Sequence, residues 1–237
     1  MTRRSSSSSA FAKPPPLGGP GAEGAPPSRT SAEVVFPTSS LEPLPVEFFA
    51  QRTTDVARQL LGRYLVRALP DGSRLIARLV ETEAYVGPED LASHSSHGLT
   101  HRTAPMFEAA GRAYVYRVYG MYWCLNVVTE GAGRGSAVLL RGAEPITGLT
   151  GRMDGPGRLC RTLDLDGSWN RADLTRGPLI LARGDPVPQA AIAASPRIGV
   201  GYAAAWADAP LRFFDATSKH VSRAPRRAPG RPEESTR

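Results

Sequence analysis

Apolar and polar positions alternate along much of the chain, between two polar ends, and this predicts a domain built mainly from strands. Runs of this kind, bounded by turn-forming residues, occupy positions 64–68, 75–85, 112–119, 122–129, 136–141, 179–183 and 197–202. Helical spacing predicts helices at 47–61, ending before Gly62, and at 157–163. Strands and helices do not alternate regularly, and no repeat is present. We therefore expect an α+β fold, a single mixed domain with a largely antiparallel curved β-sheet, surrounding helices and a protruding β-hairpin.

The strand at 75–85 begins apolar and ends in carboxylates. If the strand is regular, one face carries Leu75, Ala77, Leu79, Glu81, Glu83 and Tyr85. A carboxylate removed from water must be hydrogen-bonded, paired or protonated, and such surroundings give a general base a useful pKa. Structural ion pairing with arginine is the commoner role of a single Glu. The pattern leaves both roles open, and it favours the structural role more for Glu81 than for Glu83.

Tyrosines gather at a predicted hairpin that turns at Gly120. Four of the seven tyrosines lie within nine residues, at Tyr114, Tyr116, Tyr119 and Tyr122. Tyr is common in strands, so Tyr114 and Tyr122 have two open interpretations, sheet packing and a functional role. A large ring beside a glycine turn instead projects into solvent, which predicts that Tyr119 serves as a wedge or a stacking surface.

Most of the formal charge of +7 lies near the ends of the 237-residue chain. Residues 1–40 and 219–237 contribute +2 and +4, which leaves +1 for the residues between them. The segment 1–42 is rich in Ser, Pro, Gly and Ala, and 219–237 places arginines among Pro and Gly. Neither segment has the apolar content of a folded core. We expect one domain at 43–218 between two disordered tails that attract polyanions nonspecifically.

The cysteines and histidines give little support for a disulfide framework or a metal site. Cys124 lies in an aromatic strand, where a small buried thiol is common. His94, His97 and His101 lie close together and leave a metal-binding loop as an alternative, but no Cys or carboxylate cluster completes a ligand set. We expect no metal, no other cofactor and no membrane partner, because no apolar run is long enough to span a bilayer. Two cysteines fit a reducing cytoplasm.

Motifs spread over residues 45–215 occur in an order that resembles a known family. They are Glu83-Ala84-Tyr85, Gly87-Pro88-Glu89-Asp90 with His94, Tyr114-Val115-Tyr116 continuing through Tyr119-Gly120-Met121 to Asn126, Leu139-Leu140-Arg141 with Glu144-Pro145, Gly155-Pro156-Gly157-Arg158-Leu159-Cys160, Pro196-Arg197-Ile198-Gly199-Val200 and Pro210-Leu211-Arg212-Phe213. They resemble the alkyladenine DNA glycosylases, the 3-methyladenine DNA glycosylases of the mammalian type. The resemblance implies a base-excision-repair enzyme that flips an alkylated purine out of double-stranded DNA and hydrolyses its N-glycosidic bond. We expect a monomer that is cytoplasmic, and nucleoid-associated if bacterial.

The resemblance also implies a catalytic centre. Glu83 matches the carboxylate that deprotonates water and stabilises the positive charge developing on the sugar. Arg141 and the main-chain carbonyl of Ile198 match the groups that hold this water. An ion pair of Arg141 with Glu81 or Glu83 is compatible with that role.

Base recognition follows from other matching residues. Tyr85, His94 and Tyr116 match the walls of a base pocket, and electron-rich rings suit a base that methylation has made cationic. Asn126 matches the residue that crowds the exocyclic amine of normal guanine. Tyr119 matches the intercalating tyrosine, which enters the base stack from the minor groove.

Lysine content predicts the products of the reaction. Only Lys13 and Lys219 are present against 27 arginines, so residues 14–218 contain no lysine. A glycosylase that also cleaves the backbone needs an amine nucleophile, usually lysine, to form a Schiff base. We therefore expect hydrolysis alone, leaving an abasic site.

One loop departs from the family pattern, and two other functions stay open. The loop 95–102 is less basic than is usual in the family, and we expect His97 and His101 to act there only as weak substitutes for basic residues that contact phosphate. A noncatalytic nucleic-acid-binding or formyl-group-binding module would keep the aromatic residues but would not need Glu83 and Arg141 together. A glycoside hydrolase would use Glu81 and Glu83 as its acid pair. The resemblance implies 3-methyladenine and 7-methylguanine as substrates, with hypoxanthine and ethenoadenine as alternatives.

Overall fold

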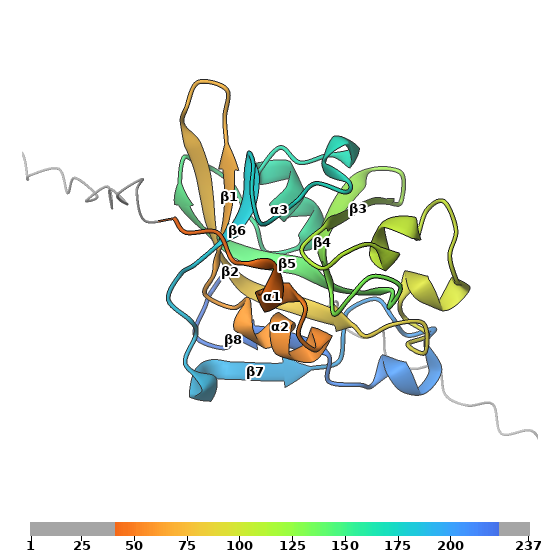
Figure 1. Ribbon diagram of the computed structural model, residues 1–237. Helices are drawn as coiled ribbons and strands as arrows, with labels where there is room; N and C mark the ends of the chain where they lie inside the picture. The colour runs from red at the N-terminus through yellow and green to blue at the C-terminus, as the bar shows by residue number, and fades with distance from the viewer. Residues whose placement is uncertain (1–40, 223–237) are drawn as a thin grey trace, which may run out of the picture. The chain divides into compact units, whose positions relative to one another are not determined.

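The computed structural model describes residues 41–222, which form one curled antiparallel sheet with helices packed on it (Figure 1). The strands are β1 (Tyr64–Ala68), β2 (Arg74–Tyr85), β3 (Ala113–Val118), β4 (Tyr122–Thr129), β5 (Ser136–Thr147), β6 (Leu179–Ala182), β7 (Ile192–Ser195) and β8 (Arg212–Asp215). The α-helices are α1 (Val46–Phe49), α2 (Thr53–Gln59) and α3 (Pro156–Thr162). Short 3₁₀ helices are η2 (His94–His97), η3 (Ala104–Phe107), η4 (Gly167–Trp169), η5 (Gln189–Ala191) and η6 (Ala204–Ala207). The predicted α+β class is confirmed.

The long strands β2 and β5 form the centre of the sheet. The strand order is β3-β4-β5-β2-β1-β6, and β8 pairs with both β2 and β7. Along one edge β2 changes partner: residues 74–78 pair with β1, and residues 81–83 pair with β8. Helix α2 packs against β2, β5 and β8, while α3 packs against β4 and β5. Apolar side chains between these layers form the main core.

A β-bulge in β2 reverses the faces of the strand. The register against β5 shifts between Leu79 and Glu81 and again between Glu81 and Thr82. Leu79 and Ala84 both lie in the main core, although regular alternation would place them on opposite faces. The Thr82 hydroxyl also donates to the carbonyl of Ala57 in α2. The prediction of one regular face was therefore wrong: beyond the bulge, the carboxylates lie on the face opposite the helix.

Two further predictions need correction. The predicted helix at 47–61 is two helices, because residue Arg52 has extended backbone angles (φ −54°, ψ 135°) and separates α1 from α2. No strand forms at 197–202; Gly199 takes a positive φ of 82° in a turn there, and the strands of this region are β7 and β8 instead. The sequence did not predict β7 or β8, because each has only four residues and β8 pairs with β2, which is distant in the sequence. The other predicted elements are present, with β5 continuing to Thr147.

The predicted tails fall mainly outside the described residues, which exclude 1–40 and 223–237. Within the described part, Glu42 accepts a main-chain hydrogen bond from Arg183, and Ser222 is buried. Between residues 41 and 222, no helix is long and apolar enough to cross a membrane.

Two glycines with similar backbone angles should tolerate alanine very differently. Gly62 (φ +89°) follows α2, and a Cβ there would lie 2.0 Å from the carbonyl oxygen of Asp185. Gly72 (φ +84°) lies in the β1–β2 turn with no atom within 4 Å of such a Cβ. We expect Gly72→Ala to cost about 1 kcal/mol of unfolding free energy, the price of the left-handed backbone alone. Gly62→Ala should cost roughly 3 kcal/mol or more, because backbone must move. Urea denaturation measures both, and equal costs would contradict this packing.

Candidate active site

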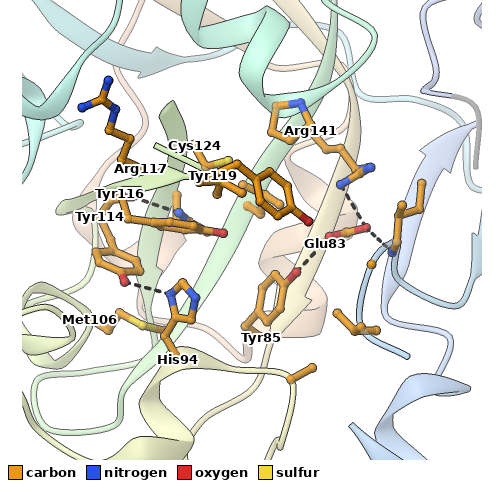
Figure 2. A pocket seen from close by; sticks show the side chains of 18 of the residues that line it. Glu83, Tyr85, His94, Met106, Tyr114, Tyr116, Arg117, Tyr119, Cys124 and Arg141 are labelled. Atoms are coloured by element: carbon orange, nitrogen blue, oxygen red, sulfur yellow. Dashed lines mark hydrogen bonds and ion pairs between the residues drawn. The ribbon is translucent and has the colours of Figure 1, made fainter. Parts of the chain in front are cut away.

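A cavity of about 640 Å³ lies at the C-terminal end of β2, where side chains from β2, β3, β4, β5 and the segments between strands converge (Figure 2). The sequence-predicted residues that line it are Glu83, Tyr85, His94, Tyr116, Tyr119, Asn126, Arg141 and Ile198. The structure thus brings all eight together. Glu83 is the one carboxylate among the described residues that line the cavity.

Glu83 is fully buried and has three partners, which Figure 2 shows as dashed lines. The main-chain N–H of Ile198 donates to its Oε1 at 2.9 Å, and the Tyr85 hydroxyl donates to its Oε2 at 3.0 Å. Arg141 Nη1 lies 3.5 Å from Oε1. These contacts engage both carboxylate oxygens and fix the orientation of the side chain. The sequence predicted a role for the carbonyl of Ile198, but did not predict that its N–H holds the acid.

Glu81 is equally buried and belongs to a different set of contacts. Its Oε1 accepts from Arg212 Nε at 2.6 Å and lies 3.1 Å from Arg141 Nε. Both of its oxygens also accept hydrogen bonds from Ser222, at 2.7 Å each. Glu81 does not line the cavity, and its geometry matches the structural ion pair that was one of its two expected roles.

Arg141 connects the two acids. It projects from β5, with Nε facing Glu81 and Nη1 facing Glu83. Since a guanidinium keeps its charge throughout the working pH range, it balances both carboxylates at once. The ion-pair role expected for Arg141 therefore includes both acids.

Aromatic rings form the wall opposite Glu83. His94 packs edge-on against Tyr116, with ring centroids 4.5 Å apart, and its Nδ1 is hydrogen-bonded to the Tyr114 hydroxyl at 2.9 Å. Burial, with smaller contributions from Arg102 and His97, lowers the pKa of His94 from 6.5 to about 4. His94 is therefore neutral near pH 7. Tyr114, for which sheet packing was one of two expected roles, also positions His94.

Arg197 supports Tyr85 from outside the cavity. Its guanidinium carbon lies 4.7 Å from the centre of the Tyr85 ring, and it forms a buried two-point ion pair with Asp90. Burial, followed by the charge of Glu83, raises the pKa of Tyr85 well above its ordinary value, so its hydroxyl remains a donor. Sequence reasoning missed Arg197 and Asp90 as supports, because nothing in a linear pattern indicates their pairing across 107 positions.

Asn126 and Tyr119 line the cavity at a buried and an exposed position, respectively. Asn126 is buried, and its side-chain N–H group donates to the carbonyl of Tyr114 at 2.9 Å, which fixes the orientation of its amide. Tyr119 lies at the tip of the β3–β4 hairpin with 86% of its surface exposed. Its φ of 51° places it in the left-handed region, followed by Gly120 at 67°. The predicted projection of Tyr119 into solvent is confirmed.

In the described part of the chain, no cluster of three or more His, Cys, Asp and Glu residues has the geometry to hold a metal ion. His94 instead bonds to Tyr114, and His97 and His101 are exposed.

Comparisons with known proteins match nearly the whole described region. A family model described as methylpurine-DNA glycosylase matches residues 47–219. A protein of Myxococcus xanthus (strain DK1622) is 50% identical over 190 residues, covering 79% of this chain and 96% of the relative. A protein of Legionella pneumophila (strain Lens) is 48% identical over 181 residues, which cover 76% of this chain and 98% of the relative. A protein of Anaeromyxobacter dehalogenans (strain 2CP-1) is 49% identical over 182 residues, which cover 77% of this chain and 86% of the relative. All three are provisionally named 3-methyladenine DNA glycosylase.

The lowered pKa of His94 predicts a loss of stability in mild acid. As pH falls below about 6.5, the unfolded chain protonates His94, whereas the folded protein does not until about pH 4. The contribution of His94 to stability is therefore complete above pH 6.5 and is lost between 6.5 and 4. Urea unfolding at several pH values should show a shallower decline for His94→Gln than for the wild type. His101→Gln, at an exposed position, should keep the wild-type decline; identical slopes for all three proteins would contradict the assignment.

Proposed function

Because the chain belongs to the methylpurine-DNA glycosylase family, we propose that it removes alkylated purines from double-stranded DNA with a water activated by Glu83. Proteins of this family are DNA-repair hydrolases that cleave N-glycosidic bonds, and this chain is such an enzyme. The observation that carries the mechanism is the fully buried Glu83, the one carboxylate among the described residues that line the cavity.

The contacts of Glu83 suit a base that acts on water. A carboxylate oriented by Arg141, Ile198 and Tyr85 cannot swing away, so a water bound to it approaches the sugar in a fixed direction. As the bond to the base breaks, positive charge develops on the sugar, and the nearby carboxylate stabilises it. In this mechanism the main-chain carbonyl of Ile198 and Arg141 help to hold the water.

The aromatic wall suits a flipped methylated purine. Tyr85, Tyr116 and neutral His94 present rings to the cavity, and ring faces attract a cationic base such as 3-methyladenine or 7-methylguanine. These bases leave without prior protonation, whereas hypoxanthine and ethenoadenine are neutral and would need a general acid. Asn126, fixed by its bond to Tyr114, would crowd the exocyclic amine of normal guanine.

The hairpin tip would open the duplex. Taking a base out of the stack costs a few kcal/mol, and the cost is lower for a damaged base. Tyr119, exposed at the rim of the same cavity, is placed to fill the vacated space from the minor groove. With no lysine at 14–218, the enzyme would stop at an abasic site.

The geometry argues against a glycoside hydrolase. That function needs two carboxylates at the reacting bond, but Glu81 is enclosed by Arg212, Ser222 and Arg141 and lies outside the cavity. A noncatalytic binding module would not need Glu83 and Arg141 together, and the two lie in contact at the cavity.

The decisive experiment compares base release from methylated duplex DNA by the wild type and Glu83→Gln. We expect the rate to fall by roughly 10²- to 10⁴-fold when the general base is lost, while binding to an abasic-site analogue persists. Glu47→Gln, an exposed acid outside the cavity, is the matched control and should keep full activity.

The same samples test the reaction type. Product strands should stay intact until alkali is added, and borohydride should trap no covalent complex. Release by Glu83→Gln at the wild-type rate would refute the catalytic assignment, and a wild type that binds without releasing base would leave only a damage-binding function.

A second experiment tests Tyr119. Tyr119→Ser should fold as the wild type does, since the ring is exposed, but should release base from duplex DNA about tenfold more slowly. The defect should shrink when the lesion is in a bulge, where stacking is already weakened. Leu99→Ala removes another exposed apolar side chain and should have no effect. An equal defect on both substrates would rule out the wedge.

A further inference from the structure

The segment after β8 returns to the catalytic arginine. Residues 218–222, which we call the C-terminal strap, lie along β5. At its start the Ser218 hydroxyl donates to Glu144 Oε1 at 2.7 Å. At its end Ser222 reaches Arg141, three positions earlier on β5.

Glu81, Arg141 and Arg212 form a buried ionic cluster, and every polar group of Ser222 has a partner in it. Its N–H donates to Glu81 Oε2 at 2.7 Å, and its carbonyl accepts from Arg212 Nη2 at 2.9 Å. Its hydroxyl donates to Glu81 Oε1 at 2.7 Å and accepts from Arg141 Nε at 3.1 Å. The hydroxyl therefore lies between the structural acid and the arginine that faces Glu83.

Gly142 provides the space for this approach. A Cβ at this position would lie 2.9 Å from Glu81 Oε2 and 3.1 Å from the carbonyl oxygen of His220. Gly142 follows Arg141 and pairs with Glu81 at the bulge of β2. A side chain at 142 would separate the strap from the cluster, so the bulge and the glycine together make room for Ser222.

We propose that Ser222 is a positioning residue for base excision, which holds Arg141 so that Nη1 stays directed at Glu83. The contact between Arg141 and Glu83, at 3.5 Å, is the longest in the cluster, whereas Arg141 Nε also lies near Glu81 at 3.1 Å. Without the hydroxyl, Nε loses an acceptor and Glu81 loses a donor. The guanidinium then turns toward Glu81 and away from Glu83. This inference rests on the proposed function of Glu83 and Arg141.

The test compares Ser222→Ala with Ser218→Ala in the full-length protein. Both changes remove a strap hydroxyl that donates to a glutamate, but only Ser222 contacts Arg141. With enzyme in excess, base release from methylated duplex DNA should slow about tenfold or more for Ser222→Ala, as expected for loss of a hydrogen bond to a charged group. Affinity for an abasic-site analogue should not change, and Ser218→Ala should match the wild type.

Two further variants separate positioning from folding. Ser222→Thr keeps the hydroxyl and should retain most of the rate, while Ser222→Cys keeps the size but not the strong donor and acceptor and should be slow. In an Arg141→Lys background, which lacks Nε, Ser222→Ala should have little further effect.

The proposal is overturned if Ser222→Ala and Ser222→Cys lower the melting temperature but release base at the wild-type rate. It is also overturned if the Ser222→Ala defect is undiminished with Arg141→Lys. A wild type that releases no base would instead refute the proposed function, so the two failures are distinguishable.

Discussion

The site depends on the burial of two carboxylates, Glu81 and Glu83, that are separated by a single residue in one strand. Glu81 and Glu83 are both removed from solvent, a large cost unless each is paired and hydrogen-bonded. Arg141 and Arg212 balance their charge. The carboxylate oxygens also accept hydrogen bonds from N–H and O–H groups of Ile198, Ser222 and Tyr85. Because Glu81 is satisfied by protein groups alone, Glu83 is left as the acid that faces the cavity.

The sequence predicted those parts of the fold that depend on local pattern. The strands at 64–68 and 122–129 match the structure to the residue, since their alternation and bounding turns are local signals. The bulge of β2 could not be predicted in this way. It depends on the pairing of Glu81 with Gly142, 61 positions away, and Gly142 carries no mark that separates it from other glycines.

In the candidate site, too, local motifs were predictable and contacts between distant positions were not. Motif resemblance supplied the residues that line the cavity, from Glu83 to Ile198, and the structure brings them together. The groups that hold them were not predicted: Arg197 behind Tyr85, Tyr114 behind His94, and Ser222 beside Arg141. Ser222 was assigned to a disordered tail because Pro and Arg follow it closely, and local composition does not show a contact with a strand 81 positions earlier.

The bulge of β2 also sets the direction in which the two carboxylates point. Before the bulge, odd-numbered side chains such as Leu79 face the core; after it, even-numbered ones such as Ala84 do. The same residues in a regular strand without the bulge would turn both carboxylates into the packed apolar interior. In such a strand the acids would oppose folding, so a single backbone irregularity decides which face of the sheet can hold charge.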